Sequence, residues 1–143
     1  MNIVFMYMFD FDKLLEDIKN KSWKDRIIRS INSVLNLYNL SAHDVTITRK
    51  ELSPDELLVA AEEECNLEKS KEFKEKHTKI PPPITVIQHR YKKVIFLGSN
   101  RAIQYVLHGK NPDCIIIKLP NHLHPKMVFE AKITLKEIIE KQK

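Results

Sequence analysis

Glycine is almost absent from this chain, with two glycines among 143 residues, at positions 98 and 109. Because glycine adopts positive φ at little steric cost, these two positions indicate where the backbone turns most tightly. Cysteine is equally scarce: Cys65 and Cys114 lie far apart in the sequence and lack the spacing of metal or redox motifs. We therefore expect two buried free thiols and no disulfide framework.

Long hydrophobic stretches are missing as well. No apolar run approaches the roughly 18 residues of a transmembrane helix, so no membrane span is expected. The segment 2–9 is apolar but short, either a strand or an extended arm, and it lacks the basic start and small-residue cleavage site of a signal peptide. We expect a cytoplasmic protein without membrane association. Abundant Lys, Ile and Glu beside few glycines are typical of a thermophile.

Charge is distributed unevenly along the sequence. Apolar residues make up 43 % of the chain, which is enough for one folded domain, and the formal net charge is +5. Residues 1–76 hold 12 Lys and Arg against 15 Asp and Glu, whereas residues 77–143 hold 12 against 4, a net charge of +8. The basic half favours a phosphorylated or nucleic-acid partner. The alternative is a solvated basic surface without a partner.

The stretch around Gly98 predicts a strand, a tight turn and a helix. Residues 94–97 form a short apolar run typical of a buried strand, and Ser99 or Asn100 can cap the following helix. The helix would have one apolar face, formed by Ala102, Ile103, Val106 and Leu107. Gly109 would end it. The free backbone N–H groups of such a turn, together with the guanidinium of Arg101, suit a phosphate. Turns of this composition also occur without any ligand.

The remaining sequence patterns indicate helices and strands in mixed order. We expect helices over 12–20, 23–38, 67–76 and 135–141, a helix capped by Ser53, strands over 44–48 and 114–119, and a β-hairpin over 84–97. This order predicts an α+β fold with a mixed sheet. Residues 1–43 form an N-terminal helical extension, whose apolar stripe packs either on the domain or on a second copy of it. The extension is therefore a candidate for homodimerisation.

Several motifs resemble the ParB/sulfiredoxin superfamily. They are Pro82-Pro83-Ile84-Thr85-Val86-Ile87, the segment from Val94 through Gly98-Ser99-Asn100-Arg101-Ala102, and Cys114-Ile115-Ile116-Ile117, preceded by Val45-Thr46-Ile47 and Leu52-Ser53-Pro54. The match covers about residues 45–120, so the resemblance implies a ParB/sulfiredoxin-like mixed sheet with helices as the domain 44–143. It also implies that Gly98, Ser99, Asn100 and Arg101 hold the phosphates of a nucleotide. The nucleotide would be ADP, ATP or CTP, with Mg.

The sequence departs from this family at positions that matter for catalysis. Asn100 stands where members resembling sulfiredoxin have a reactive Cys. Leu97 stands where the free serine kinases and several ParB-like nucleases have Asp, and leucine can neither accept a proton nor bind a metal. Leu52-x-Pro54-x-Glu56 does resemble a kinase segment, which makes Glu56 the candidate catalytic carboxylate. The alternative role of Glu56 is that of an N3 residue at a helix start.

A second candidate site lies at the predicted hairpin tip. His89, Arg90, Tyr91, Lys92 and Lys93 place one aromatic ring among basic groups, as nucleic-acid-binding surfaces do. His122 and His124 lack a visible third ligand, so we predict no metal site. The sequence thus predicts a ParB-like module that binds a nucleotide or DNA through phosphate. The alternatives are a nucleotide-dependent small-molecule kinase resembling the free serine kinases and a ParB-like nuclease, for which no acidic metal cluster is visible.

Overall fold

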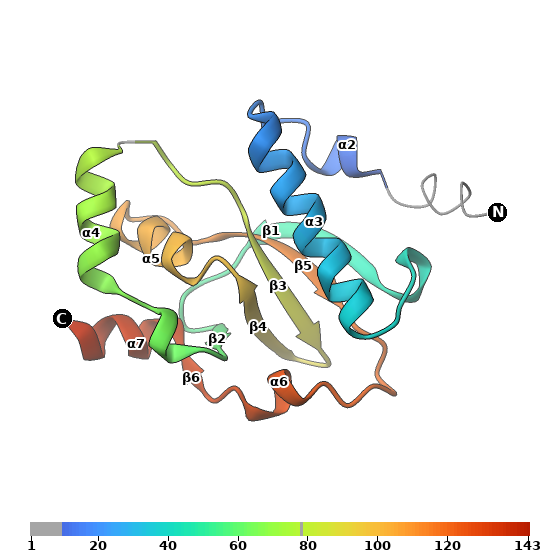
Figure 1. Ribbon diagram of the computed structural model, residues 1–143. Coiled ribbons are helices and arrows are strands. Elements are labelled where there is room, and N and C mark those ends of the chain that lie inside the picture. Colours follow the sequence, from blue (N-terminus) through green and yellow to red (C-terminus); the bar gives the residue numbers. More distant parts are fainter. Residues whose placement is uncertain (1–9, 78) are drawn as a thin grey trace.

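The computed structural model describes residues 10–77 and 79–143 (Figure 1). Its helices are α2 (Phe11–Leu14), α3 (Lys21–Leu37), α4 (Leu67–Lys76), α5 (Ser99–Leu107), α6 (Lys126–Glu130) and α7 (Leu135–Gln142), with short 3-10 turns at Ala42–Asp44 and Glu62–Glu64. Its strands are β1 (Thr46–Glu51), β2 (Leu57–Val59), β3 (Ile84–His89), β4 (Lys92–Leu97), β5 (Asp113–Lys118) and β6 (Ile133–Thr134).

The six strands form one mixed sheet in the order β1-β5-β3-β4-β2-β6. β3 and β4 make the antiparallel hairpin that the sequence predicts, and β5 pairs in parallel with β3. β2 lies parallel to β4, and the two edge strands, β1 and β6, are antiparallel to their neighbours. The α+β class with a mixed sheet is therefore confirmed.

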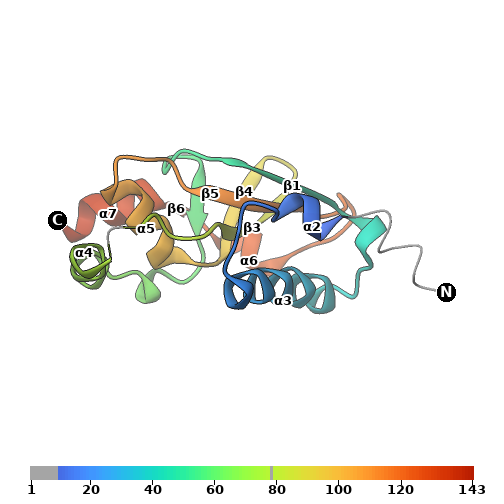
Figure 2. The same cartoon turned by 90° about the horizontal axis from the view of Figure 1, so that it is seen from above.

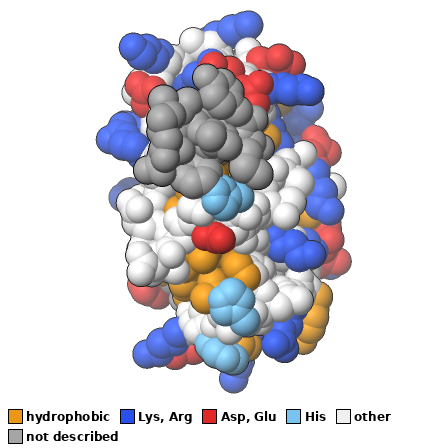
Figure 3. All heavy atoms as spheres, turned by 90° about the vertical axis from the view of Figure 1, so that its right-hand side faces the viewer, with side chains coloured by type: hydrophobic (Ala, Val, Ile, Leu, Met, Phe, Trp, Pro, Cys, Tyr) orange, Lys and Arg blue, Asp and Glu red, His pale blue; other side chains and the backbone are white. Residues whose placement is uncertain are grey.

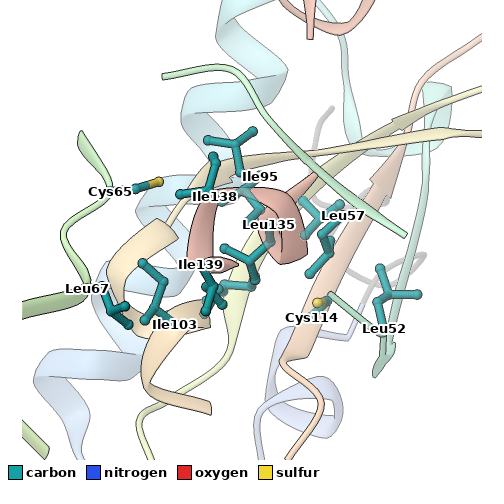
Figure 4. Close-up of a cluster of buried hydrophobic side chains, with 14 of the residues drawn as sticks. Leu52, Leu57, Cys65, Leu67, Ile95, Ile103, Cys114, Leu135, Ile138 and Ile139 are labelled. Atoms are coloured by element: carbon teal, nitrogen blue, oxygen red, sulfur yellow. The ribbon is translucent and has the colours of Figure 1, made fainter. Parts of the chain in front are cut away.

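Both faces of this sheet are buried, because alternate residues of the central strands point in opposite directions. Ile84 and Val86 of β3 belong to a cluster with α5 and α7, whereas Ile87 belongs to a second cluster with α3. Figure 4 shows the first cluster, to which α5 contributes Ile103 and α7 contributes Ile138 and Ile139. Figures 1 and 2 show α4, α5 and α7 together at one end of the molecule and α3 lying along the sheet away from them.

Helix α3 packs its apolar stripe on the sheet of its own chain. Ile27, Ile31, Val34 and Leu35 are all buried in the second cluster. The sequence left two positions for this stripe, on the domain or on a second copy of it. The position on the domain is confirmed, so the stripe is not available to a second copy. The helix begins earlier than predicted, at Lys21, because the side chain of Asn20 accepts a hydrogen bond from Trp23 N.

Two predicted helices are wrong in extent or type. The helix expected over 12–20 is a single turn, α2, which Asp10 caps. The helix expected after Ser53 does not form: residues 54–56 are a turn and Leu57–Val59 is strand β2. Leu57 and Val59 are buried on the face shared with α7, and β2 pairs with two strands. Sheet pairing and burial with period two therefore outweigh the local capping signal.

Cys65 and Cys114 are buried and free, as predicted. Helix α6 and strand β6 were not predicted, because 120–134 shows no clear periodicity. The strand or arm expected over 2–9 lies outside the described residues. Over 10–77 and 79–143, the structure contains no helix with the length and hydrophobicity needed to cross a membrane.

Arg49 of β1 ties the first helical turn to the sheet. Its guanidinium forms ion pairs with Asp17 at 2.6 Å and Asp113 at 2.8 Å, and it donates to Leu14 O at 2.9 Å. The hydrogen bonds from Arg49 hold the pKa of Asp17 below its usual range. A carboxyl group with a lowered folded-state pKa adds stability above its unfolded pKa and loses that contribution as the pH falls through the folded value.

We therefore predict a pH-dependent effect of Asp17→Asn. At pH 7 the substitution should lower the free energy of unfolding by at most about 1 kcal/mol, because Asp17 is 62 % exposed and solvent screens the pair. The difference from the wild type should shrink as the pH falls from about 4 toward 3. Urea unfolding at both pH values measures it, with the exposed Asp12→Asn as control. If Asp17→Asn lowered the free energy of unfolding as much at low pH as at pH 7, the ion pair with Arg49 would not be the cause.

Candidate anion-binding site

The junction between β4 and α5 has the geometry that the sequence predicts. β4 ends at Leu97, Gly98 adopts φ 108°, and α5 begins at Ser99. The hairpin register shifts next to this junction, between Thr85 and Val86, and such bulges redirect strand ends. The N-cap is Gly98 itself, not Ser99 or Asn100 as predicted, because the left-handed backbone already places the turn at the glycine.

The N-terminus of α5 has no side-chain cap. Asn20, Asn66 and Thr134 accept backbone hydrogen bonds at the starts of α3, α4 and α7, but Gly98 has no side chain to do so. Ala102 N bonds to Gly98 O at 2.8 Å. The N–H groups of residues 99–101 form no hydrogen bond with the described part of the chain, so three donors remain for a ligand at the positive end of the helix dipole.

A pocket of about 740 Å³ opens at this helix start. Residues from two separate helices, the hairpin and the loop before α4 line it: Trp23, Arg26, Ile27, Arg29, Ser30, Ser33, Glu64, Thr85, Phe96, Leu97, Gly98, Ser99, Asn100 and Arg101. Its volume lies within the roughly 300–1,000 Å³ typical of small-molecule sites. One wall is the start of α5, and the other wall is α3.

Arg101 lies partly buried in this pocket with an uncompensated charge. Its Nη1 donates to Pro83 O at 2.7 Å and to Pro82 O at 3.4 Å, and its guanidinium carbon is 5.0 Å from the centre of the Trp23 ring. It forms no ion pair with a carboxylate of residues 10–77 or 79–143. Burial lowers the pKa of Arg101 to about 10, so the side chain stays protonated at neutral pH.

Gly98 makes room for this arginine. A Cβ at position 98 would lie 2.8 Å from Arg101 Nη2 and 2.8 Å from Ile84 Cγ2. A side chain there would meet both the guanidinium and the buried core. The glycine is thus required twice, by its positive φ and by the close approach of Arg101.

Helix α3 supplies pocket residues that the sequence analysis missed. Arg26 and Arg29 form no ion pair within the described chain, and Arg26 lies 4.9 Å from the centre of the Trp23 ring. Ser30 is 4 % exposed, and its Oγ has no hydrogen-bond partner among the described residues. Trp23, Arg26, Ser30 and Ser33 follow one another at spacings of three and four and therefore share one helical face. This pattern does not indicate which part of the fold that face meets.

The side chains of two predicted phosphate ligands have other partners. Asn100 Oδ1 accepts from Asn66 N at 2.8 Å, and Asn100 Nδ2 donates to Glu64 O at 2.9 Å. Its amide therefore joins the starts of α4 and α5, and only its backbone N–H is left for an anion. Burial raises the pKa of Cys65, and a hydrogen bond with the Ser99 side chain partly offsets this. Gly98 and Arg101 line the pocket, and their role as phosphate ligands stays a prediction.

The hairpin tip lies at the other end of β3 and β4, so the structure does not bring the two candidate sites together. Each strand has six residues at about 3.3 Å per residue, which separates the tip from the pocket by roughly 16–20 Å. Tyr91 is 84 % exposed and Arg90 has φ 57°, but His89 is 2 % exposed and its Nε2 lies 3.3 Å from Asn121 O. The prediction that His89 contacts nucleic acid is therefore wrong, because its ring belongs to the interior.

Glu56 also lies away from the pocket. Its carboxylate accepts from Ser53 N at 3.1 Å and from Ser53 Oγ at 2.9 Å, and these bonds lower the pKa of Glu56. This turn precedes β2 and lies near Lys93, at the end of β4 opposite to Leu97. The helix N3 role of Glu56 is wrong, because no helix forms here. Its role as a catalytic carboxylate stays a prediction, at a position outside the pocket. Among the described residues, the acidic residue that lines the pocket is Glu64.

Histidines gather on another face of the molecule, beside a small hydrophobic patch (Figure 3). His43 and His122 lie near Asp44, whose pKa is lowered chiefly by hydrogen bonds from Ser41, while the ring of His124 stacks on Phe129 at 6.0 Å. Within the described ranges, no three His, Cys, Asp or Glu side chains are placed to hold a metal ion.

The comparisons with known proteins leave the family open. No family model, curated protein or solved structure matches this chain. The ParB/sulfiredoxin resemblance accordingly rests on the motif residues, and the site rests on its own geometry.

Proposed function

We propose that this protein binds a nucleotide through its phosphates, at the pocket between α3 and the start of α5. The observation that carries the proposal is the Arg101 guanidinium, which is partly buried in the pocket. Among the described residues it has no carboxylate partner, and the three neighbouring N–H donors form no hydrogen bond. A buried cation without a counter-ion is unfavourable, and an anion at a helix N-terminus relieves it. Membership of the ParB/sulfiredoxin superfamily, which we also propose, would give Gly98 and Arg101 the same role.

A small molecule suits the pocket better than a nucleic-acid strand. The anion-binding groups line a hollow of about 740 Å³ and do not form an open stripe. The basic hairpin tip, which would extend a nucleic-acid footprint, lies at the far end of the strands. ADP, ATP and CTP are therefore the proposed ligands.

The proposal is one of binding without catalysis. Leu97 lines the pocket and is 50 % exposed, so the position of the kinase and nuclease carboxylate offers no proton acceptor or metal ligand. Glu56 is held in a turn outside the pocket. Among the described residues, Glu64 is the carboxylate that a kinase or nuclease activity at this pocket would have to use.

Thermal unfolding with ATP, ADP, CTP and a short DNA oligonucleotide tests the proposal. A ligand at about 100 times its dissociation constant should add roughly 2.7 kcal/mol to the free energy of unfolding. We expect this stabilisation with at least one nucleotide in the wild type and its loss in Arg101→Gln. If DNA alone stabilised the protein, and Arg101→Gln kept this stabilisation, the binding site would be the hairpin tip and not the pocket. No stabilisation by any of the four would refute the proposal.

A further inference from the structure

The two walls of the pocket each carry anion-binding groups of their own. The α5 wall offers the free N–H groups of residues 99–101 and the donors of Arg101 that the proline carbonyls leave unused. The α3 wall offers Arg26 and Arg29, three positions apart on one helix. Like charges at this spacing repel each other, and no carboxylate in the described chain pairs with either one.

Ser30 adds an independent sign that the α3 wall binds a ligand. It follows Arg29 directly and lies four positions, or about one helical turn, after Arg26. Its hydroxyl is buried and unpartnered among residues 10–77 and 79–143, an unusual state for a buried polar group. A phosphoryl oxygen lying against this wall would accept a hydrogen bond from Ser30 Oγ.

Trp23 connects the two walls. The guanidinium carbons of Arg26 and Arg101 lie 4.9 Å and 5.0 Å from the centre of its ring, so the indole contacts one arginine from each wall. The charge on Arg26 also helps to lower the pKa of Arg101, as expected for neighbouring cations. A single phosphoryl group at the α5 N-terminus would leave the α3 arginines without an anion.

We propose that the pocket recognises a diphosphate, with one phosphoryl group at the N-terminus of α5 and its neighbour on Arg26, Arg29 and Ser30 of α3. This inference rests on the proposed function, because it adds a second subsite to the same pocket. The diphosphate can belong to inorganic pyrophosphate or to a nucleoside diphosphate. A monophosphate engages one wall only.

Calorimetric titrations separate these possibilities. Orthophosphate, pyrophosphate, AMP and ADP are titrated in a chelating buffer into the wild type, Arg29→Gln and Arg101→Gln. Arg90→Gly serves as the charge-matched control, because it removes one positive charge at the hairpin tip, where φ 57° suits glycine. Pyrophosphate should bind the wild type at least tenfold more tightly than orthophosphate, and ADP at least tenfold more tightly than AMP.

The variants should divide the pocket into its two subsites. Arg29→Gln should weaken pyrophosphate and ADP about tenfold and leave orthophosphate and AMP unchanged, whereas Arg101→Gln should weaken all four. ADP that binds more tightly than pyrophosphate would identify the nucleoside diphosphate as the preferred source. Equal affinity for pyrophosphate and orthophosphate, or an equal loss for both in Arg29→Gln, would overturn the second subsite and leave the proposed function standing. If none of the four compounds binds the wild type, the proposed function fails as well.

Discussion

Replacing Arg101 with alanine is expected to weaken nucleotide binding by about 1.5–3 kcal/mol, or roughly tenfold to more than a hundredfold. The guanidinium belongs to the first turn of α5, and it is held in place by Pro83 O and the Trp23 ring. Arginine also presents a planar fork that matches two phosphoryl oxygens. Isothermal titration with ADP measures the loss.

The same arginine also holds the segment before β3, so the substitution must be separated from an effect on folding. Arg101→Lys retains the charge but lacks the fork, and we expect it to keep only part of the affinity. Arg90→Gly should bind ADP as the wild type does. Unchanged ADP affinity at low salt in a folded Arg101→Ala would show that Arg101 is a structural clamp for the proline segment and nothing more.

Gly98→Ala is expected to destabilise the protein by at least about 2 kcal/mol and to weaken nucleotide binding as well. The left-handed backbone at φ 108° is strained for any L-residue, which costs roughly 1–2 kcal/mol. The new Cβ would also lie 2.8 Å from both Arg101 Nη2 and the fully buried Ile84. The guanidinium would have to move away from the helix N-terminus.

Gly109→Ala is the matched control for this prediction. Gly109 also has a positive φ, 72°, but a Cβ there would meet no atom of the described residues within 4 Å. Gly109→Ala should therefore lower the free energy of unfolding only by the backbone cost of about 1 kcal/mol and leave the ADP affinity unchanged. Urea unfolding and ADP titration of both variants measure the difference. Equal losses of stability in the two variants would mean that Arg101 does not crowd Gly98 in solution.

The sequence predicts the hairpin and the start of α5 because their determinants are local. Apolar residues define β3 and β4, while Gly98 and Gly109 mark the two ends of α5 with the positive φ that glycine favours. By contrast, the segment after Ser53 carries a strong helix-start signal and still becomes strand β2. Its conformation depends on pairing with β4 and β6, whose paired residues lie 36 or more positions away in the sequence.

The candidate site is predictable only on its α5 wall. Gly98 and Arg101 follow from the strand–turn–helix pattern and from the family resemblance. The α3 wall does not follow, because the sequence contains nothing that places Arg26, Arg29 and Ser30 opposite α5. That placement results from the burial of the apolar stripe of α3 on the sheet, so the helical extension becomes part of the pocket. The division into 1–43 and 44–143 stays a prediction about sequence organisation.

The net charge of a sequence segment also does not predict where the site lies. The N-terminal half of the sequence is net acidic, yet it contributes Arg26 and Arg29 to the pocket, and the basic C-terminal half contributes Arg101. A net charge summed along the chain therefore does not locate the positive potential of the folded protein. His89 shows that membership of a basic sequence run does not place a side chain on the surface, because its ring is buried.

Amide chemical shifts recorded during a titration with ADP test the central claim most directly. The backbone N–H groups of Ser99, Asn100 and Arg101 should shift most, because they form no hydrogen bond with residues 10–77 or 79–143 and would donate to the phosphate. The indole N–H of Trp23, the one tryptophan in the sequence, should shift with them and saturate at the same ADP concentration. Shifts centred on the hairpin tip at Arg90 and Tyr91, or no shifts at millimolar ADP, would contradict the assignment of this pocket as a nucleotide site.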